Sequence, residues 1–508
     1  MTTHQTLQDL ARAAHHDLRT SWRQAGKRWL LVAALVLAVF VPRLLSLGTT
    51  LTVDEPLWRD RGVGFIKDVA SLHFAETIPA GQPGVTTAWL VGLTYPVKSL
   101  AADQAVIALA GSLLILIITY FLVQLWGWRW GMIAGFFLAL DPFLIAHSRL
   151  VHTDALLALF ALLSAVALLA AVWPRYAGRP LIKRYLVVSA VAGGLALLTK
   201  VSFLLAMPAL AALLFATLWQ TRTSWRQILA ASLVWGAVFA LTVFVLWPAL
   251  WQNAGGVVSL LTERSALHAG GTRAEETTSA DWYYLREGFF RLTPVTSLLA
   301  LAGIAGLASA HHAAMRRAAV ALGISGVAFA ILLSFGGDKS DRYILFTLLT
   351  VVLFAVYGLR LLTERLARRW AGAALLPLVC LLWLAADAAR LHPYYLAHYN
   401  RLYPIEADHK LGWGEGLEQA AAWIRDRNPD ASVAAYYPRV LGHWLPGGST
   451  ENVDKKDNKD YLVLYRSMFE RGEGAPETDI VNEYLGADRP PEHVISINGL
   501  PYVWIFRP

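Results

Sequence analysis

The sequence is poor in cysteine and in charged residues. Of its 508 residues one is a cysteine, Cys380, and 16% are Asp, Glu, Lys or Arg. A single cysteine excludes a disulfide framework and a zinc site built on cysteines. Soluble globular chains carry about 25% charged residues, and the hydrophobic share here is 56%. Because the apolar residues stand in runs of about 20, the length that spans a bilayer, the chain is predicted to be a polytopic α-helical membrane protein.

Eleven apolar segments are predicted to span the membrane, and one further segment is too short to do so. The short segment, residues 84–98, is broken by Pro96 and is predicted to be interfacial or re-entrant. Residues 57–72 mix charged and apolar side chains, which is typical of a helix on the membrane surface. The predicted spans are residues 29–47, 105–125, 131–149, 154–173, 186–200, 202–219, 228–248, 294–310, 318–335, 343–361 and 372–389.

Positive charge is concentrated on one side of these spans. The basic arm 1–28 and the alternate connections that follow it carry excess Lys or Arg, for example Arg175 and Arg368. Because Lys and Arg gather in cytoplasmic loops, the N-terminus is predicted to be cytoplasmic, in a multi-pass cell (inner) membrane protein. These loops also explain the net charge of +8, which therefore does not indicate a nucleic-acid partner. The other side receives the first outer loop, residues 48–104, and the tail 391–508.

The tail differs in composition from the predicted transmembrane domain, residues 29–390. Residues 412–430 have the apolar stripe of a helix, and short strand-like runs follow at 432–437, 461–465, 493–497 and 502–506. Turn-rich, charged stretches separate these runs. The tail is therefore predicted to be a small α/β domain outside the membrane.

Two adjacent carboxylates, Asp54 and Glu55, follow the first apolar segment. Ionisable residues at the membrane boundary usually serve a function, although a solvated helix cap would also place acids there. Repulsion between neighbouring carboxylates raises the apparent pKa of the pair and makes a better proton acceptor. The two residues are therefore candidates for a catalytic base.

The predicted topology gathers further polar side chains on the same outer face. Asp141, which precedes Pro142, is expected to cap a helix, and Arg149 has the alternative of snorkelling to the interface. Lys200 lies in a turn between two apolar helices, where a lone lysine invites an anionic partner. The whole set comprises Gln82, Asp141, His147, Arg149, His152, Asp154, Lys200, Lys339, Asp341, Arg342 and Tyr343.

Carboxylates and cations on one membrane face suit a reaction on a lipid with a phosphate headgroup. Lys200 would hold the phosphate as a point charge and Arg342 in bidentate fashion. A carboxylate would accept the proton of an acceptor hydroxyl. Phosphate leaves readily once its charge is neutralised, so the lipid donor would supply the chemical energy.

In this order along the chain, the motifs resemble those of GT-C glycosyltransferases that use lipid-phosphate sugars. The nearest families are the protein O-mannosyltransferases and the aminoarabinose transferases of lipid A. The resemblance covers most of residues 30–390 and implies the GT-C fold. It consists of the pair Asp54–Glu55, QPGVTTAWL (82–90), HTDALLALFALL (152–163), LLTKVS (197–202) and KSDRY (339–343).

The resemblance also implies roles for individual residues. Asp54 would be the base of an inverting displacement, Glu55 would support it, and Asp154 would be a second acid near the donor. Gln82 stands where related enzymes often have His or Lys. The residues expected to bind the donor phosphate are Lys200, Arg342, Tyr343 and Arg149. No cofactor is expected to be required, although Asp54, His152 and Asp154 are possible ligands of a divalent cation.

The expected function is transfer of a sugar from a polyprenyl-phosphate donor to a hydroxyl group of a protein, lipid or glycan, at the outer face of the membrane. One alternative is a glycan polymerase or ligase that uses polyprenyl diphosphate donors. Another is a lipid or sugar transporter, but transporters tend to have internal repeats and helices broken near the midplane, and the sequence shows no repeat.

Overall fold

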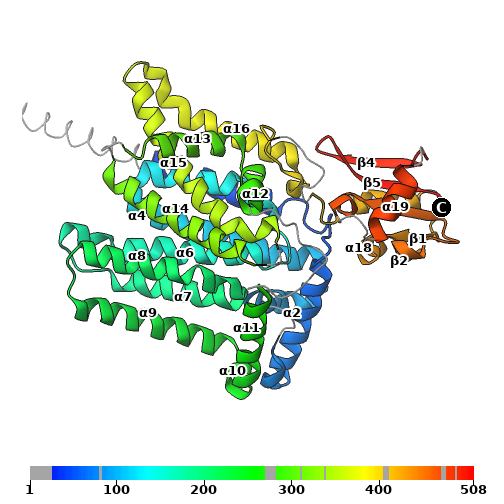
Figure 1. Cartoon of the computed structure of the whole chain (residues 1–508), viewed down its shortest axis with the longest axis horizontal. Coiled ribbons are helices and arrows are strands. Elements are labelled where there is room, and N and C mark those ends of the chain that lie inside the picture. The colour runs from blue at the N-terminus through cyan, green and yellow to red at the C-terminus, as the bar shows by residue number, and fades with distance from the viewer. Residues whose placement is uncertain are drawn as a thin grey trace, which may run out of the picture.

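The computed structural model describes residues 26–78, 83–268, 282–308, 312–336, 339–403, 411–470, 476–486 and 489–508. Of the predicted site residues, Gln82 lies outside these ranges. The described residues form a helical bundle and, beyond one end of it, a small domain that contains a sheet (Figure 1).

Seven helical stretches among the described residues are long and apolar enough to cross a membrane, or eight if a bent pair counts as one span. The bent pair is α12 (Tyr283–Arg291) and α13 (Pro294–Ala305), which meet at 118°. The chain is thus a multi-pass membrane protein. The seven stretches are α4 (Leu100–Leu140), α6 (Asp154–Val172) with η3 (Trp173–Ala177), η4 (Val201–Leu205) with α8 (Met207–Gln220), α9 (Trp225–Leu246), α14 (Ala313–Ser334), η5 (Asp341–Ile344) with α15 (Leu345–Ala367), and η6 (Ala371–Leu375) with α16 (Leu376–Leu391).

The predicted count of eleven spans is not confirmed. A helix over residues 26–44 starts at the edge of the described residues, and α7 (Lys183–Thr199) has only 17 residues. Two predicted spans share α4, whose backbone leaves the helical region at Gly127 with φ +79°. The parts of α4 before and after Gly127 are in close contact. A Cβ added to Gly131 would lie only 2.5 Å from the Val123 Cα.

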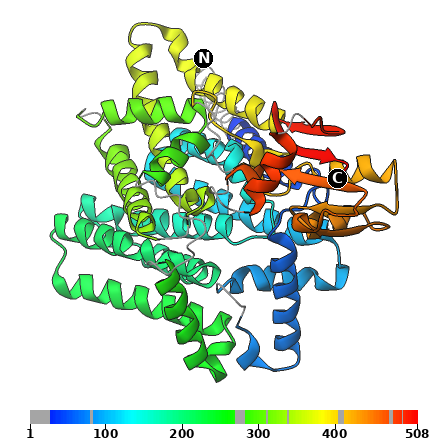
Figure 2. The same ribbon diagram turned by 45° about the vertical axis from the view of Figure 1, so that its right-hand side comes forward.

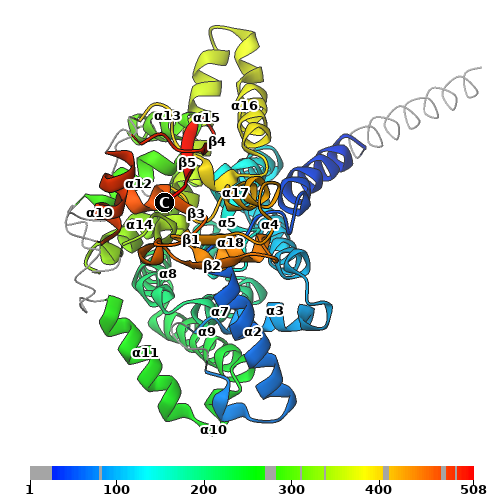
Figure 3. The ribbon, with the colours of Figure 1, turned by 90° about the vertical axis from the view of Figure 1, so that its right-hand side faces the viewer.

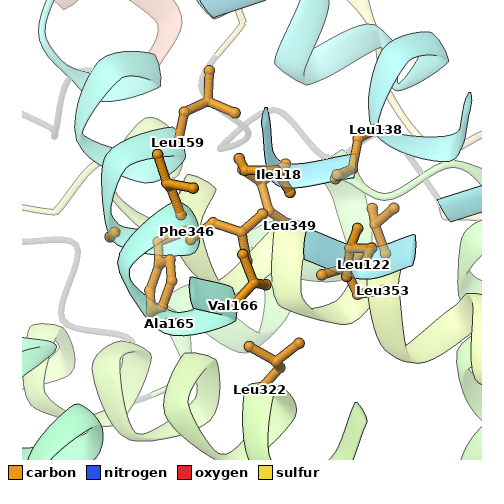
Figure 4. Close-up of a cluster of buried hydrophobic side chains, with 14 of the residues drawn as sticks. Ile118, Leu122, Leu138, Leu159, Ala165, Val166, Leu322, Phe346, Leu349 and Leu353 are labelled. Carbon is orange, nitrogen blue, oxygen red and sulfur yellow. The ribbon is translucent and has the colours of Figure 1, made fainter. Parts of the chain in front are cut away.

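The central helix of the bundle is α6, whose 19 residues are all buried. It is apolar all round, the pattern of a helix enclosed by others, and it packs against α4, α7 and α15. Figure 4 shows Leu159 of α6, Ile118 of α4 and Leu349 of α15 in one cluster of buried hydrophobic side chains. The first residue of α6, Asp154, is therefore held in a tightly packed position.

The first loop, residues 48–104, contains α2 (Glu55–Ala70), η1 (Phe74–Glu76), α3 (Val85–Thr94) and η2 (Tyr95–Val97). Figures 1 and 3 show α2 lying across the end of the bundle, where α10 (Ala249–Gln252) and α11 (Ala254–His268) also lie. α3 has ten residues, so it is about 15 Å long, half the thickness of a hydrocarbon core. It cannot span a bilayer alone, as predicted for residues 84–98. It packs on α2, where Gly62 meets Val91.

The C-terminal domain contains one mixed sheet with the strand order β2-β1-β3-β5-β4. β1 is parallel to β2 and β3, whereas β5 is antiparallel to β3 and β4. Alternate residues face opposite sides of the sheet: Val463 packs toward α17 and α18, and Leu462 toward α19. The elements are α17 (Leu417–Arg425), β1 (Ser432–Ala435), α18 (Pro438–Trp444), β2 (Ser449–Asn452), η8 (Val453–Lys455), β3 (Tyr461–Tyr465), η9 (Arg466–Glu470), α19 (Pro476–Leu485), β4 (His493–Ile497) and β5 (Leu500–Phe506).

This domain confirms the predicted α/β class. Four of its strands coincide with the predicted strand-like runs. The fifth, β2, lies in the stretch that was predicted to be turns, because its sequence, STEN, is polar. A polar strand at the edge of a sheet lacks the hydrophobic alternation by which strands are recognised.

Candidate active site

Four segments that are distant in the sequence meet at the end of the bundle that faces the C-terminal domain. In Figure 2, α2 (blue) and the C-terminal domain (orange and red) lie on the same side of the bundle. Asp54 immediately precedes α2, and Asp154 begins α6. Lys200 connects α7 to η4, with an extended backbone that interrupts the helices. His152 comes from the turn before α6, and Arg342 from η5.

The buried centre of the site is an ion pair between Asp154 and Lys200. Lys200 Nζ lies 2.7 Å from Asp154 Oδ1, and both side chains are 2% exposed. The other carboxylate oxygen, Asp154 Oδ2, lies 2.9 Å from His152 Nδ1 and 3.3 Å from Arg342 Nε. These are close polar contacts without the geometry of hydrogen bonds. A buried carboxylate needs such partners, because an unpaired charge in the protein interior is strongly destabilising.

Asp54 lies at the accessible edge of the same cluster, and its side chain is 31% exposed. Asp54 Oδ2 lies 3.3 Å from His152 Nε2 and 3.4 Å from Arg342 Nη2. His152 and Arg342 therefore each connect Asp54 to Asp154. Burial raises the pKa of Asp54, but His152 and the charge of Arg342 outweigh this effect, so the pKa lies below its usual value. This direction is opposite to the raised pKa that the sequence predicted for paired carboxylates.

Glu55 belongs to a different network. Its fully buried carboxylate accepts hydrogen bonds from Thr52 N and Oγ1 (2.7 and 3.1 Å), Gln104 Nε2 (2.9 Å) and Val151 N (3.0 Å). Burial raises its pKa. Glu55 thus ties the first loop to α4 and to the turn before α6, and it does not form a pair with the Asp54 carboxylate.

Arg149 also lies apart from the predicted phosphate-binding residues. Its Nη1 donates to Pro42 O (3.3 Å), and its Nη2 donates to Leu45 O (2.5 Å) and Ser46 O (3.1 Å). These carbonyls are at the end of the helix over residues 26–44, where basic side chains commonly bind. Arg149 therefore binds the C-terminal end of that helix.

Asp141 caps α5 (Pro142–His147), as its position before Pro142 predicted, by accepting a hydrogen bond from Leu144 N (2.8 Å). His147, at the end of α5, is buried and makes no hydrogen bond through its ring nitrogens within the described part of the chain. Burial lowers the pKa of His147 to about 3. The neutral ring is therefore favoured at physiological pH, and His147 is not expected to supply a cation to a phosphate.

The turn that carries Arg342 is fixed by its neighbours. Asp341 is buried, and its Oδ2 accepts a hydrogen bond from Arg291 Nε (2.6 Å). Its Oδ1 accepts one from Arg342 N (2.7 Å). The Tyr343 ring lies below Lys200, with its centroid 3.9 Å from Nζ, and half-buried Lys339 precedes this turn. The structure thus brings together Asp54, His152, Asp154, Lys200, Arg342 and Tyr343.

Trp413 also lies at this site, although no sequence motif indicated it. This residue belongs to the segment that leads into the C-terminal domain, and its ring centroid lies 4.3 Å from the Arg342 Cζ and 5.0 Å from the His152 ring. A tryptophan between two glycines is the signal that could have pointed to it. In the sequence, the segment was assigned only to a helix with an apolar stripe.

Within the described ranges, no group of three or more His, Cys, Asp and Glu side chains is arranged to hold a metal ion. The possible ligands Asp54, His152 and Asp154 lie together, with the His152 ring between the two carboxylates, and both carboxylates also contact Arg342. The dispensability of a divalent cation stays a prediction.

No protein-family model and no curated protein matches the sequence. Solved structures do match the fold. ArnT from Cupriavidus metallidurans in the apo state has 15% identity and a TM-score of 0.53, with 95% of this chain and 98% of that chain covered. The same protein bound to undecaprenyl phosphate has 16% identity and a TM-score of 0.51, with 94% and 98% covered. The apo oligosaccharyltransferase from Archaeoglobus fulgidus has 13% identity and a TM-score of 0.54, with 88% and 70% covered.

At these identities the likeness concerns the fold, and it agrees with the fold that the sequence motifs implied. The helical bundle, the first loop across its end and the small C-terminal domain together show that the chain has the GT-C fold.

Proposed function

We propose that the chain is a glycosyltransferase that moves a sugar from a polyprenyl-monophosphate donor to a hydroxyl acceptor at the outer face of the cell membrane. The observation that carries the proposal is a partly exposed carboxylate, Asp54, beside a cluster that holds Lys200 and Arg342 around Asp154. One solved structure of similar fold is bound to undecaprenyl phosphate, which supports a donor of this class.

The cationic part of the cluster suits one phosphate group. Arg342 has a planar guanidinium that can bind two phosphate oxygens, and Lys200 supplies a point charge. Tyr343 lies against Lys200, so the ammonium is held over a ring rather than free to move. Neutralising the phosphate charge would stabilise it as the leaving group, the usual role of cationic side chains in such sites.

In this proposal Asp54 acts as the base. It would accept the proton of the acceptor hydroxyl while the acceptor oxygen bonds to the anomeric carbon of the sugar. The bond from that carbon to the phosphate oxygen would break at the same time, and the polyprenyl phosphate would leave with the electron pair. A single displacement of this kind inverts the anomeric configuration.

Because Asp54 contacts Arg342, donor binding would also change the strength of Asp54 as a base. In the resting site Arg342 lowers the pKa of Asp54, which keeps the carboxylate ionised but makes it a weaker base. A donor phosphate that draws the Arg342 charge to itself would raise the pKa of Asp54 and strengthen the base. Asp154 would act differently, by orienting Lys200, Arg342 and His152 from its buried position.

A second candidate function is transfer of a whole glycan from a polyprenyl diphosphate donor, since an oligosaccharyltransferase is among the proteins of similar fold. A diphosphate donor would place a second phosphate near the site. Among the described residues, the cations in contact with Asp54 or Asp154 are Lys200 and Arg342, and His152 is the third basic contact. This small set favours a monophosphate donor.

The test is a donor panel offered to purified protein in lipid. Wild type and the variant Asp54→Asn receive polyprenyl-monophosphate and polyprenyl-diphosphate sugars, and the released lipid phosphate is measured. Asp60→Asn is the matched control, because Asp60 is an exposed carboxylate on α2 that pairs with Arg439. Consumption of a monophosphate donor by wild type and Asp60→Asn, but not by Asp54→Asn, is expected. Consumption of diphosphate donors alone would replace the proposal with the second candidate.

A further inference from the structure

The segment 411–416 carries a side chain from the C-terminal domain into the candidate active site. Trp413 lies over Arg342, with 4.3 Å between the guanidinium carbon and the ring centroid. It also meets the edge of the His152 ring at 5.0 Å, with 75° between the ring planes. These two residues are the ones that connect Asp54 to Asp154.

On one side the segment is fastened to the first loop. Val53 N donates a hydrogen bond to Trp413 O (3.0 Å), so the residue next to Asp54 is bound to the residue that covers Arg342. Gly414 has a φ of +125°, and a Cβ there would lie 2.5 Å from Leu51 O. A side chain at this position would therefore displace the segment from the first loop.

On the other side the segment is fastened to the sheet. Gly414 N donates to the Tyr465 Oη of β3 (2.8 Å), and Tyr465 Oη donates to Glu415 Oε2 (3.0 Å). The same carboxylate oxygen accepts a hydrogen bond from Trp413 N. Tyr465 and Glu415 are both buried. The position of the indole is thus set by the packed interior of the C-terminal domain.

We propose that Trp413 is a positioning residue, through which docking of the C-terminal domain fixes the Arg342 guanidinium and the His152 imidazole in the geometry that turnover needs. This inference rests on the proposed function for its kinetic readout. The C-terminal domain then contributes to the active site through the segment 411–416.

Removing the indole should lower the rate of turnover without unfolding the site. A cation–π contact of a partly desolvated Arg is worth roughly a tenfold change in an equilibrium constant. Trp413→Ala is therefore expected to lower kcat/KM for the donor about tenfold, because Arg342 and His152 lose the surface that orients them. Trp413→Phe keeps an aromatic face above Arg342 and should recover most of the loss.

Trp423 supplies a matched control. It is another tryptophan of the C-terminal domain with an arginine over its ring, Arg427 at 3.8 Å, and it stacks on His493 of β4. Trp423→Ala removes an equally large side chain from the same domain but not from the site. If Trp413 only stabilises the domain, the two alanine variants will reduce the amount of folded protein while kcat and KM per folded molecule stay at wild-type values. That result would overturn the proposal.

A second measurement does not depend on turnover. Hydrogen exchange of the first-loop peptide around Val53 is compared in wild type, Gly414→Ala and Trp423→Ala. The proposal expects faster exchange in Gly414→Ala alone, because the hydrogen bond to Trp413 O is displaced. Unchanged exchange would overturn the coupling. If wild type consumes no donor, the proposed function fails, and this measurement still decides whether the segment holds the first loop.

Discussion

Asp54 and Glu55 are consecutive in the chain, yet their carboxylates lie in different environments. Asp54 contacts His152 and Arg342 at 3.3 and 3.4 Å and is partly exposed. Glu55 is fully buried and accepts four hydrogen bonds, none of them from a cation. Asp54 comes before the first residue of α2 and Glu55 is that residue, so the start of the helix turns the two side chains apart. One carboxylate is therefore available for chemistry and the other for structure.

The first prediction separates these two roles. Asp54→Asn is expected to reduce transfer by roughly 10²–10⁴-fold, the range for loss of a general base, with thermal unfolding close to wild type. Glu55→Gln is expected to lower the free energy of unfolding by about 1–3 kcal/mol, because the amide nitrogen would face buried donors. Donor turnover and thermal unfolding in lipid measure both effects. Normal turnover in Asp54→Asn would remove it from the role of base.

A second prediction concerns Arg149, which the sequence placed among the phosphate-binding residues. Its guanidinium donates to Pro42 O, Leu45 O and Ser46 O. Arg149→Ala is expected to lower the free energy of unfolding by about 2 kcal/mol, since helix-end carbonyls lose their donors. KM for the donor should stay unchanged. A raised KM with normal stability would restore Arg149 to the phosphate site.

Much of the fold followed from patterns along the chain. Long apolar runs predicted the membrane helices, and short strand-like runs predicted four of the five strands. The outer-face cluster of Asp154, Lys200 and Arg342 was predicted because each residue lies at a helix end on the same side. The directions of side chains were not predictable in this way. Whether Glu55 faces Asp54 or Gln104 depends on packing between the first loop and α4, which the local sequence does not determine.

The segment around Trp413 shows a second limit of sequence analysis. Trp413 and Arg342 are in contact although they are 71 positions apart in the sequence. No periodic pattern in the sequence predicts such a contact. The position of the indole depends on left-handed backbone at Gly412, Gly414 and Gly416 and on the buried Tyr465. Glycines flanking a tryptophan indicate a special backbone, but they do not say what the tryptophan will contact.

A third prediction concerns the buried pair of Lys200 and Asp154. Removing one partner of a buried ion pair costs about 3–5 kcal/mol, because the other charge remains unpaired. Asp154→Asn and Lys200→Met are each expected to destabilise the protein strongly, and the double variant should be less destabilised than the sum. Thermal unfolding of the four proteins gives the coupling energy. Additive effects would show that Arg342 and His152 satisfy Asp154 without Lys200.

The fourth prediction is a shift in pH dependence. Burial raises the pKa of Asp54, and His152 and Arg342 lower it further than burial raises it. The acidic limb of kcat/KM reports the base of the free enzyme, so in wild type it should lie below the ordinary aspartate value of about 3.9. Arg342→Gln removes one of the lowering causes and is expected to move the limb to higher pH. The pH profile of kcat/KM in both proteins measures the shift.

Two features make this test independent of the weaker donor binding that Arg342→Gln should also cause. The position of the limb on the pH axis does not depend on the height of the profile, so a low rate still reports the pKa. The pH dependence of stability gives a second readout. A carboxylate with a depressed folded pKa stabilises the fold above its unfolded pKa, and it loses that contribution as the pH falls through the folded value. Without Arg342 the pKa of Asp54 is depressed less, so Arg342→Gln should lose less stability than wild type on acidification.

The control is Arg427→Gln, which changes an arginine over Trp423 and should leave the acidic limb in place. An unmoved limb in Arg342→Gln would mean that Arg342 does not control the ionisation of the base, and the coupling of donor binding to base strength would then be wrong.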